Sequence, residues 1–224
     1  MNKFFEKILV SIEPSKEWKI FLNYLTTMFS DSYFYLLSVI ETTKFIGIGI
    51  KLYEDYLSDL IENSMKDYED ILKEKEIKYK ILIRKGRVKD NAFDIVKKEN
   101  IDLIVIGSHS APEVKRLKLG GVAKDILINS HIPVLIMNSL VEPPKNPKIL
   151  NPTTGSSFSY NASIFALKFT KNFNGNLTIL YLIRNEREAE EYFKKIKIEA
   201  ENLGVTINCK IVEDDPLKSI LENS

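Results

Sequence analysis

Short apolar runs rich in β-branched residues alternate with longer amphipathic patterns along this chain, and this alternation constrains its fold more than any other feature. Such alternation is typical of strand–helix–strand units, in which parallel strands are covered by helices on both faces. The apolar runs of the first 140 residues predict five strands, at 7–12, 33–40, 78–84, 102–107 and 133–137. Helical spacing of apolar residues predicts helices at about 18–29, 53–74, 91–99 and 120–129. We therefore expect an α/β fold with an open parallel five-stranded sheet.

Composition excludes several classes of protein. The chain has 224 residues, 44% of them hydrophobic, and its 32 Lys and Arg residues balance 31 Asp and Glu residues. This content can bury a core, and the balanced charge argues against nucleic acid or an anionic membrane as the main partner. One cysteine and two histidines are too few for a disulfide framework or a typical zinc site. Because no signal-like or membrane-spanning apolar run occurs, we expect a cytoplasmic protein.

The chain then starts again after a linker that is rich in proline. Residues 142–147 contain three prolines, and the following segment 148–156 repeats 7–15 with Lys-Ile-Leu and the final serine identical. Strands and helices follow in the original order, to the point where Ile220 takes the place of Ile95. We therefore predict a complete domain at 1–140, a linker at 141–147 and an incomplete second copy at 148–224.

Four segments in a fixed order resemble the universal stress protein family, arranged here in tandem. They are Lys7 to Val10 with Glu13-Pro14-Ser15, Asp102 to His109, Leu119 to Ala123, and Ile132 to Ile136. The resemblance implies the strand order 3-2-1-4-5 with helices on both faces, and dimerisation through the fifth strand. It also implies that the strand at 148–151 would be an exposed edge, because the second copy lacks strands four and five. We expect that truncation or gene shortening removed the missing part, or that the first domain or another chain covers this edge.

Some members of this family bind ATP through the pattern Gly, two residues, Gly, nine residues, Gly and then Ser or Thr. The spacing is intact here, but its four positions are Gly107, Ser110, Gly120 and Gly121. The Cβ of Ser110 would hinder close approach of a phosphate, and Gly121 lacks a hydroxyl that could cap the helix or donate to a phosphate. Because each such loss costs about 1–3 kcal/mol, we expect ATP to bind weakly or not at all, with Mg²⁺ only where ATP binds.

At the adenine end, the family aspartate corresponds to Glu13, which keeps the charge on a longer side chain. The second copy has Thr154 at this position and lacks the phosphate loop, so it is not expected to hold ATP. The resemblance implies the following contact set in the first domain: Ile12, Glu13, Val39, Ile40, Ile106, Gly107, His109, Ser110, Gly120, Gly121 and Val122.

Purely structural roles stay open for several of these residues. A strand-to-helix turn also requires glycine, so Gly107 and Gly120 do not by themselves require a ligand. Trp18 belongs to an apolar helical stripe, and we expect His131 to be structural and Cys209 to be buried and inert. Asp214 and Asp215, before Pro216, are typical of a helix N-cap.

No nucleophile, base and orienting group occur together, so the sequence favours a non-enzymatic stress-response protein with a degenerate adenine nucleotide site. Two alternatives remain. The first is a slow ATPase assisted by Glu13 or a loop cation. The second is an interaction scaffold without nucleotide. The expected protein partners are a second copy of the chain, or the other domain of the same chain, paired through edge strands.

Overall fold

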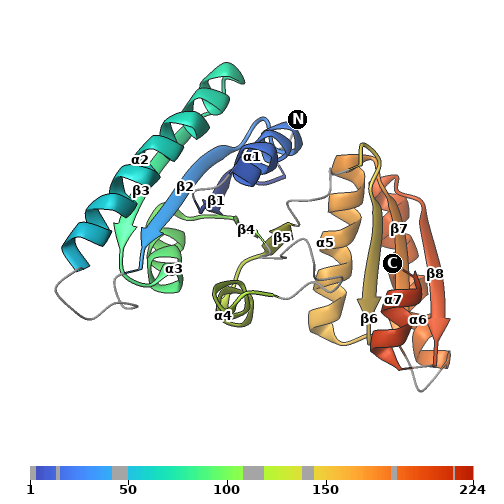
Figure 1. Ribbon diagram of the computed structural model, residues 1–224. Coiled ribbons are helices and arrows are strands. Elements are labelled where there is room, and N and C mark those ends of the chain that lie inside the picture. The colour runs from blue at the N-terminus through green and yellow to red at the C-terminus, as the bar shows by residue number, and fades with distance from the viewer. Residues whose placement is uncertain are drawn as a thin grey trace. The chain divides into compact units, whose positions relative to one another are not determined.

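The computed structural model describes residues 4–13, 16–41, 50–107, 119–137, 144–182, 186–213 and 215–223. The chain divides into two compact units, Met1–Glu142 and Pro143–Ser224 (Figure 1). Within the described residues, no helix is long and apolar enough to cross a membrane.

The first unit is a five-stranded parallel sheet with helices on both faces (Figure 1). Its strands lie in the order β3-β2-β1-β4-β5, and every pair of neighbours is parallel. This confirms the expected fold class and strand order. The elements are β1 (Lys7–Ser11), α1 (Lys16–Met28), β2 (Tyr33–Ile40), α2 (Ile50–Glu74), β3 (Tyr79–Lys85), α3 (Val88–Glu99), β4 (Leu103–Gly107), α4 (Gly121–Asn129) and β5 (Val134–Met137).

Alternation along the strands divides the core into two layers. Leu9, Tyr35 and Ile104 pack with residues of α3 and α4 in one cluster. Side chains one position away point to the opposite face, where α1 and α2 contact each other. The apolar stripe expected on the first helix lies in this second layer and is buried, and its members are Trp18, Phe21, Leu22, Leu25 and Phe29.

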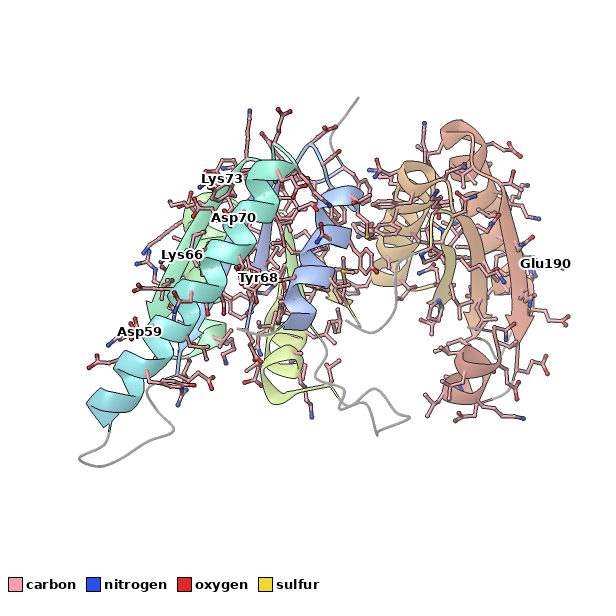
Figure 2. All side chains as sticks on the ribbon, turned by 45° about the horizontal axis from the view of Figure 1, so that its top comes forward. Asp59, Lys66, Tyr68, Asp70, Lys73 and Glu190 are labelled. Carbon is pink, nitrogen blue, oxygen red and sulfur yellow. The ribbon has the colours of Figure 1, made fainter. Side chains whose placement is uncertain are left out.

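The long helix α2 extends beyond the sheet that it covers. Its 25 residues span about 37 Å, whereas the 7 residues of β3 span only about 23 Å. Not all of the apolar residues of α2 are buried, because Tyr56 is 63% exposed and Leu60 is 39% exposed. Only the later part of its apolar stripe, represented by Tyr68 and Leu72, is fully packed, and Figure 2 shows Lys66 and Lys73 on other sides of the same helix.

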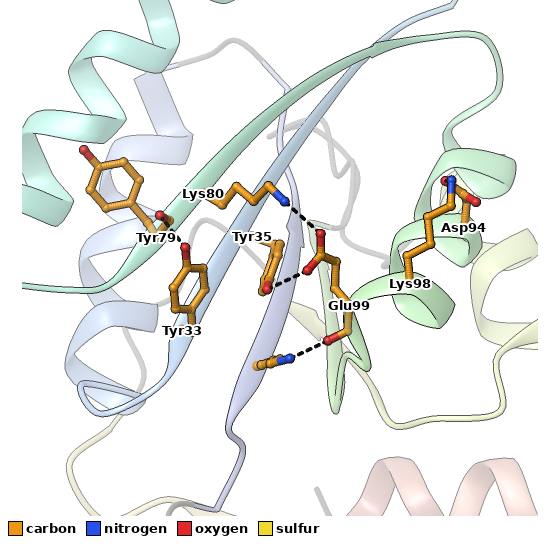
Figure 3. A network of polar contacts seen from close by, with 8 residues as sticks. Tyr33, Tyr35, Tyr79, Lys80, Asp94, Lys98 and Glu99 are labelled. Carbon is orange, nitrogen blue, oxygen red and sulfur yellow. Dashed lines mark hydrogen bonds and ion pairs between the residues drawn. The ribbon is translucent and has the colours of Figure 1, made fainter.

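A polar network ties α3 to the amino ends of the strands (Figure 3). The Glu99 carboxylate accepts hydrogen bonds from the Tyr35 hydroxyl at 3.0 Å and from Lys80 Nζ at 2.8 Å. The Glu99 backbone carbonyl accepts a third bond from Lys7 Nζ at 2.7 Å. Asp102 adds a carboxylate oxygen that accepts the backbone N–H groups of Glu6 and Lys7, each at 2.9 Å. These bonds fix the ends of the strands that are furthest from the candidate site.

The second unit repeats the connectivity of the first six elements. Its elements are β6 (Lys148–Thr153), α5 (Ser157–Phe173), β7 (Asn176–Leu182), α6 (Glu186–Leu203), β8 (Ile207–Val212) and α7 (Pro216–Asn223). The sheet has the order β6-β7-β8, which matches β1-β2-β3, and its pairs are parallel. Among the described residues, β6 has a partner on one side only, whereas β1 pairs with both β2 and β4.

Two element boundaries differ from the prediction for identifiable reasons. Helix α3 begins at Val88, three residues before the expected start, because Arg87 adopts the extended backbone of an N-cap. Strand β6 continues to Thr153, although the sequence predicted its end at 151. Pro152 is tolerated within it because β6 is an edge strand, where a missing N–H need not break a ladder.

The Tyr35 hydroxyl gives the first unit a pH dependence in the alkaline range. Burial, together with the bond to Glu99, raises the pKa of Tyr35 from 10.0 to about 12. The neutral phenol is therefore favoured in the folded state, and its contribution to stability is complete below pH 10 and is lost as the pH rises toward 12. We expect Tyr35→Phe to flatten the fall in unfolding free energy between these values, as measured by denaturant titration with Trp18 fluorescence. The control is Tyr56→Phe at an exposed site of the same unit; an equal effect of both substitutions would contradict this assignment.

Candidate functional site

The chain leaves β1 and β4 in opposite directions at the carboxyl edge of the first sheet. The two strands are neighbours, with Ser11 paired to Ile106. After β1 the chain enters α1 on one face, whereas after β4 it leads to α4 on the other face. Such a switch in direction opens a crevice where ligands bind in parallel α/β sheets. Both Glu13 and Gly107, predicted as contacts, lie at this edge.

The turn after β1 is held from both sides. The backbone N–H of Ile12 donates to the carbonyl of Leu37 at 2.8 Å, which continues the ladder between β1 and β2. The Tyr68 hydroxyl, directed inward from α2 (Figure 2), donates to the Glu13 carbonyl at 3.3 Å. The Glu13 side chain is exposed, whereas the Ile12 side chain is buried. Glu13 therefore places an exposed side chain at the carboxyl edge of the sheet.

The predicted contact residues at the ends of β2 and β4 differ in their exposure to solvent. Val39 is partly exposed and packs at the border of the α3 and α4 layer. Ile40 and Ile106 are each 3% exposed, so their side chains belong to the core. Of the two positions that the sequence left open at the end of β2, Val39 is the one whose side chain reaches the surface.

Packing explains the glycine at position 107, for a reason that the sequence did not reveal. A Cβ at this position would lie 3.2 Å from Cζ2 of Trp18, which is closer than ordinary van der Waals contact. Trp18 is 8% exposed and packs edge-to-face on Phe21, with 4.3 Å between the ring centroids. The prediction that Trp18 is a core residue is confirmed. The glycine therefore makes room for the indole ring, whether or not a phosphate approaches it.

The amino end of α4 is uncapped by the residues that the structure describes. Gly120 is the N-cap residue in an extended conformation, and none of the described side chains caps the helix there. Gly121 is exposed, and a Cβ added to it would meet no atom of the described residues within 4 Å. Free N–H groups and the helix dipole favour an anion at such an end. Val122 turns into the core cluster instead. His109 and Ser110, the other two predicted contacts, lie outside the described residues.

The equivalent region of the second unit is filled by its own side chains. A Cβ at Gly155, where φ is +78°, would overlap the Tyr181 hydroxyl. The Tyr192 hydroxyl lies 2.7 Å from Ser163 Oγ and accepts a bond from Thr153 at 3.2 Å. Ser163 also bonds to Asn151. This buried cluster uses polar groups that could otherwise face a ligand.

The remaining candidates take structural roles, with one correction. His131 is exposed, and Asp215 accepts the backbone N–H of Lys218 at 3.0 Å as an N-cap. The expectation that Cys209 is buried is wrong, because it is only partly buried, and desolvation raises the pKa of its thiol. Within the described part of the chain, no three acidic, histidine or cysteine side chains gather to hold a metal.

Sequence reasoning missed two neighbours of the site. The spacing of Tyr68 indicated only an apolar residue of its helix. Nothing in the sequence indicated that its hydroxyl reaches the turn after β1. Arg84, one residue before the end of β3, is in register with Val39, and the sequence did not single it out because strand order decides which strand lies beside β2.

The two glycines of the site are expected to respond oppositely to the same substitution. Gly107→Ala pushes a methyl group against Trp18 and should lower the free energy of unfolding by about 1–3 kcal/mol. Gly121→Ala meets open space in a helix and should raise it by up to about 1 kcal/mol. Denaturant unfolding followed by Trp18 fluorescence measures both. Equal destabilisation by the two changes would contradict the geometry at Trp18.

Comparisons with known proteins agree with this architecture. The model of the universal stress protein family matches residues 5–138. The universal stress protein MJ0531 of Methanocaldococcus jannaschii is 24% identical over 111 residues, which covers 48% of this chain and 65% of that protein. MJ0577 of the same organism is 28% identical over 81 residues, which covers 36% of this chain and 50% of that protein. The chain thus spans less than two thirds of either relative.

Solved structures resemble the fold over nearly the whole chain. A universal stress protein from Archaeoglobus fulgidus has a TM-score of 0.77 at 23% identity, and the match covers 99% of this chain and 83% of the Archaeoglobus chain. The functionally unknown protein PA1789 from Pseudomonas aeruginosa has a TM-score of 0.57 at 15% identity, with coverage of 98% and 79%. Because the family model matches more than half of the residues and the strand order agrees, the chain belongs to the universal stress protein family.

Proposed function

We propose that this chain is a cytoplasmic stress-response protein whose first unit retains a degenerate site for an adenine nucleotide, and that it acts without catalysis. The second unit repeats the strand order of β1, β2 and β3 and is proposed to support the first unit without contributing to its site. The observation that carries the proposal is the amino end of α4, which the described side chains leave uncapped, in a sheet that also places the exposed side chain of Glu13 at its carboxyl edge.

The chemistry of the crevice suits a nucleotide better than a metal or a neutral ligand. An uncapped helix end stabilises phosphate, and any Mg²⁺ would arrive with the phosphates of ATP. Val39 offers an apolar surface for a base, and Glu13 can accept a hydrogen bond from an exocyclic amine. The missing hydroxyl at Gly121 and the Trp18 ring against Gly107 both weaken the phosphate end. We therefore propose ATP as a weak ligand.

Isothermal titration with ATP tests this proposal, and a pair of variants makes it sharp. Gly121→Ser adds a hydroxyl that can donate to a phosphate, and it should tighten ATP binding roughly tenfold, as expected for one bond to a charged group. Gly121→Ala adds the same Cβ without the hydroxyl and is the matched control. ATP binding in the micromolar range by the unmodified chain would contradict the degenerate site. Absence of binding by the unmodified chain and by Gly121→Ser would refute the nucleotide site.

Self-association through the outer edge of β5 is a second proposal, favoured by exposed apolar residues next to that edge. β5 is the last strand of the five-stranded sheet. Leu127 and Ile128 on the neighbouring helix α4 are 47% and 68% exposed. A hydrophobic rim beside an unpaired strand is a common basis for pairing of sheets between chains. Pairing of β5 or β6 with the other unit of the same chain would use the same free backbone groups.

Sedimentation equilibrium distinguishes these arrangements. The unmodified chain is expected to form dimers at micromolar concentration, and Ile128→Lys should shift it toward monomers by at least about tenfold in dissociation constant, because a charge would enter the apolar interface. Leu217→Lys, at an equally exposed position of α7, is the matched control and should leave the equilibrium unchanged. A monomer at 100-fold higher concentration would argue for pairing within the chain.

A further inference from the structure

Arg84 lies at the carboxyl end of β3, directly beside the apolar end of β2. It pairs with Val39 in the parallel register of the two strands. Paired residues point to the same face of a sheet, and their strands are about 4.8 Å apart. Arg84 and Val39 therefore share the face that α3 and α4 cover, at the edge where the candidate crevice opens.

The Arg84 side chain is exposed, and no hydrogen bond or ion pair joins it to any residue that the structure describes. Lys80 lies on the same face of the same strand, four residues earlier, and there the Glu99 carboxylate holds the cation at 2.8 Å (Figure 3). A cation on an edge strand can serve simply to prevent pairing with another chain. That role would be served at any position along the strand. Arg84, however, pairs with Val39, which is the one residue at the end of β2 that is partly exposed.

Glu13 lies on the side of Val39 that is opposite Arg84. Ser11 pairs with Leu37 and the Ile12 N–H also bonds to Leu37, so Glu13 follows directly after the end of this ladder, toward the carboxyl end of β2. An acidic side chain and a guanidinium thus flank an apolar surface, with about 10 Å between the two outer strands before the side chains close the gap. The phosphate-favouring end of α4 lies beyond β4, on the side of β1 away from Arg84. Arg84 is therefore placed for the base end of a nucleotide and not for its phosphates.

An adenine ring is chemically complementary to Glu13, Val39 and Arg84. Its faces are apolar, its exocyclic amine donates hydrogen bonds, and its ring nitrogens accept them. A carboxylate accepts from the amine, and a planar guanidinium donates to ring nitrogens or stacks on the ring. Guanine presents a carbonyl oxygen where adenine has its amine, and this oxygen would face the carboxylate without a proton between them.

We propose that Arg84 contacts the adenine base of the bound nucleotide, opposite Glu13, and so contributes to selection of adenine over guanine; this inference rests on the proposed nucleotide site.

Titration calorimetry on the full chain with ATP, GTP and inorganic tripolyphosphate tests this role. Arg84→Gln should weaken ATP binding about tenfold, because one bond from a charged donor is lost, and should change tripolyphosphate binding less than twofold. The same substitution should also lower the ratio of ATP affinity to GTP affinity. Arg87→Gln removes the same charge from an exposed residue three positions along and is the matched control, with less than a twofold effect on all three ligands. Where the unmodified chain binds too weakly to measure, the same series is made in Gly121→Ser.

The outcomes separate this inference from the function on which it rests. ATP binding that is indifferent to Arg84→Gln overturns the base contact alone. An equal loss for ATP, GTP and tripolyphosphate also overturns it, because a general field effect would not distinguish a base from a phosphate chain. Absence of ATP binding by both the unmodified chain and Gly121→Ser overturns the proposed site and this inference together.

Discussion

The parallel pairing of β1 with β4 is the interaction on which the first unit depends. Leu9, Val10, Ile104 and Val105 are fully buried, and the two strands carry helices on both faces. A sheet that is covered on both sides tolerates almost no polar side chain in its central strands, which explains their continuous apolar sequences. The same pairing makes the chain diverge at the carboxyl edge, so the stability of the core and the position of the candidate site have one cause.

The second unit shows what happens when this pairing is missing from the described chain. β6 begins with the same Lys-Ile-Leu as β1, but among the described residues it has a neighbour on one side only. No divergence of two strands opens a crevice there, and the space near the end of β6 is occupied by Tyr181 and by the cluster around Tyr192. Buried hydroxyl groups of this kind need partners, and Tyr192, Ser163 and Thr153 satisfy one another. The cluster thus satisfies its own buried polar groups within the three-stranded unit.

The candidate site combines residues with opposite consequences for binding. Gly121 and Glu13 are exposed, whereas a Cβ at Gly107 would press against Trp18. A glycine that makes room for an indole ring would be needed even if no phosphate were bound. The spacing of glycines is therefore weak evidence for a nucleotide site in this chain, and the open end of α4 is stronger evidence, because an uncapped helix end has unsatisfied N–H groups.

The sequence by itself determined the order and type of the elements, because periodicity depends on local geometry alone. The boundaries of β2 were predicted to the residue, and those of most other elements in the first unit to within one or a few residues. The strand order followed from the family resemblance and not from periodicity. Contacts across the sheet were decided only by the tertiary structure. The approach of Trp18 to Gly107, the bond from Tyr68 to the β1 turn and the register of Arg84 with Val39 join residues far apart in sequence. The packing of strands and helices sets such contacts, and no local pattern of residues encodes them.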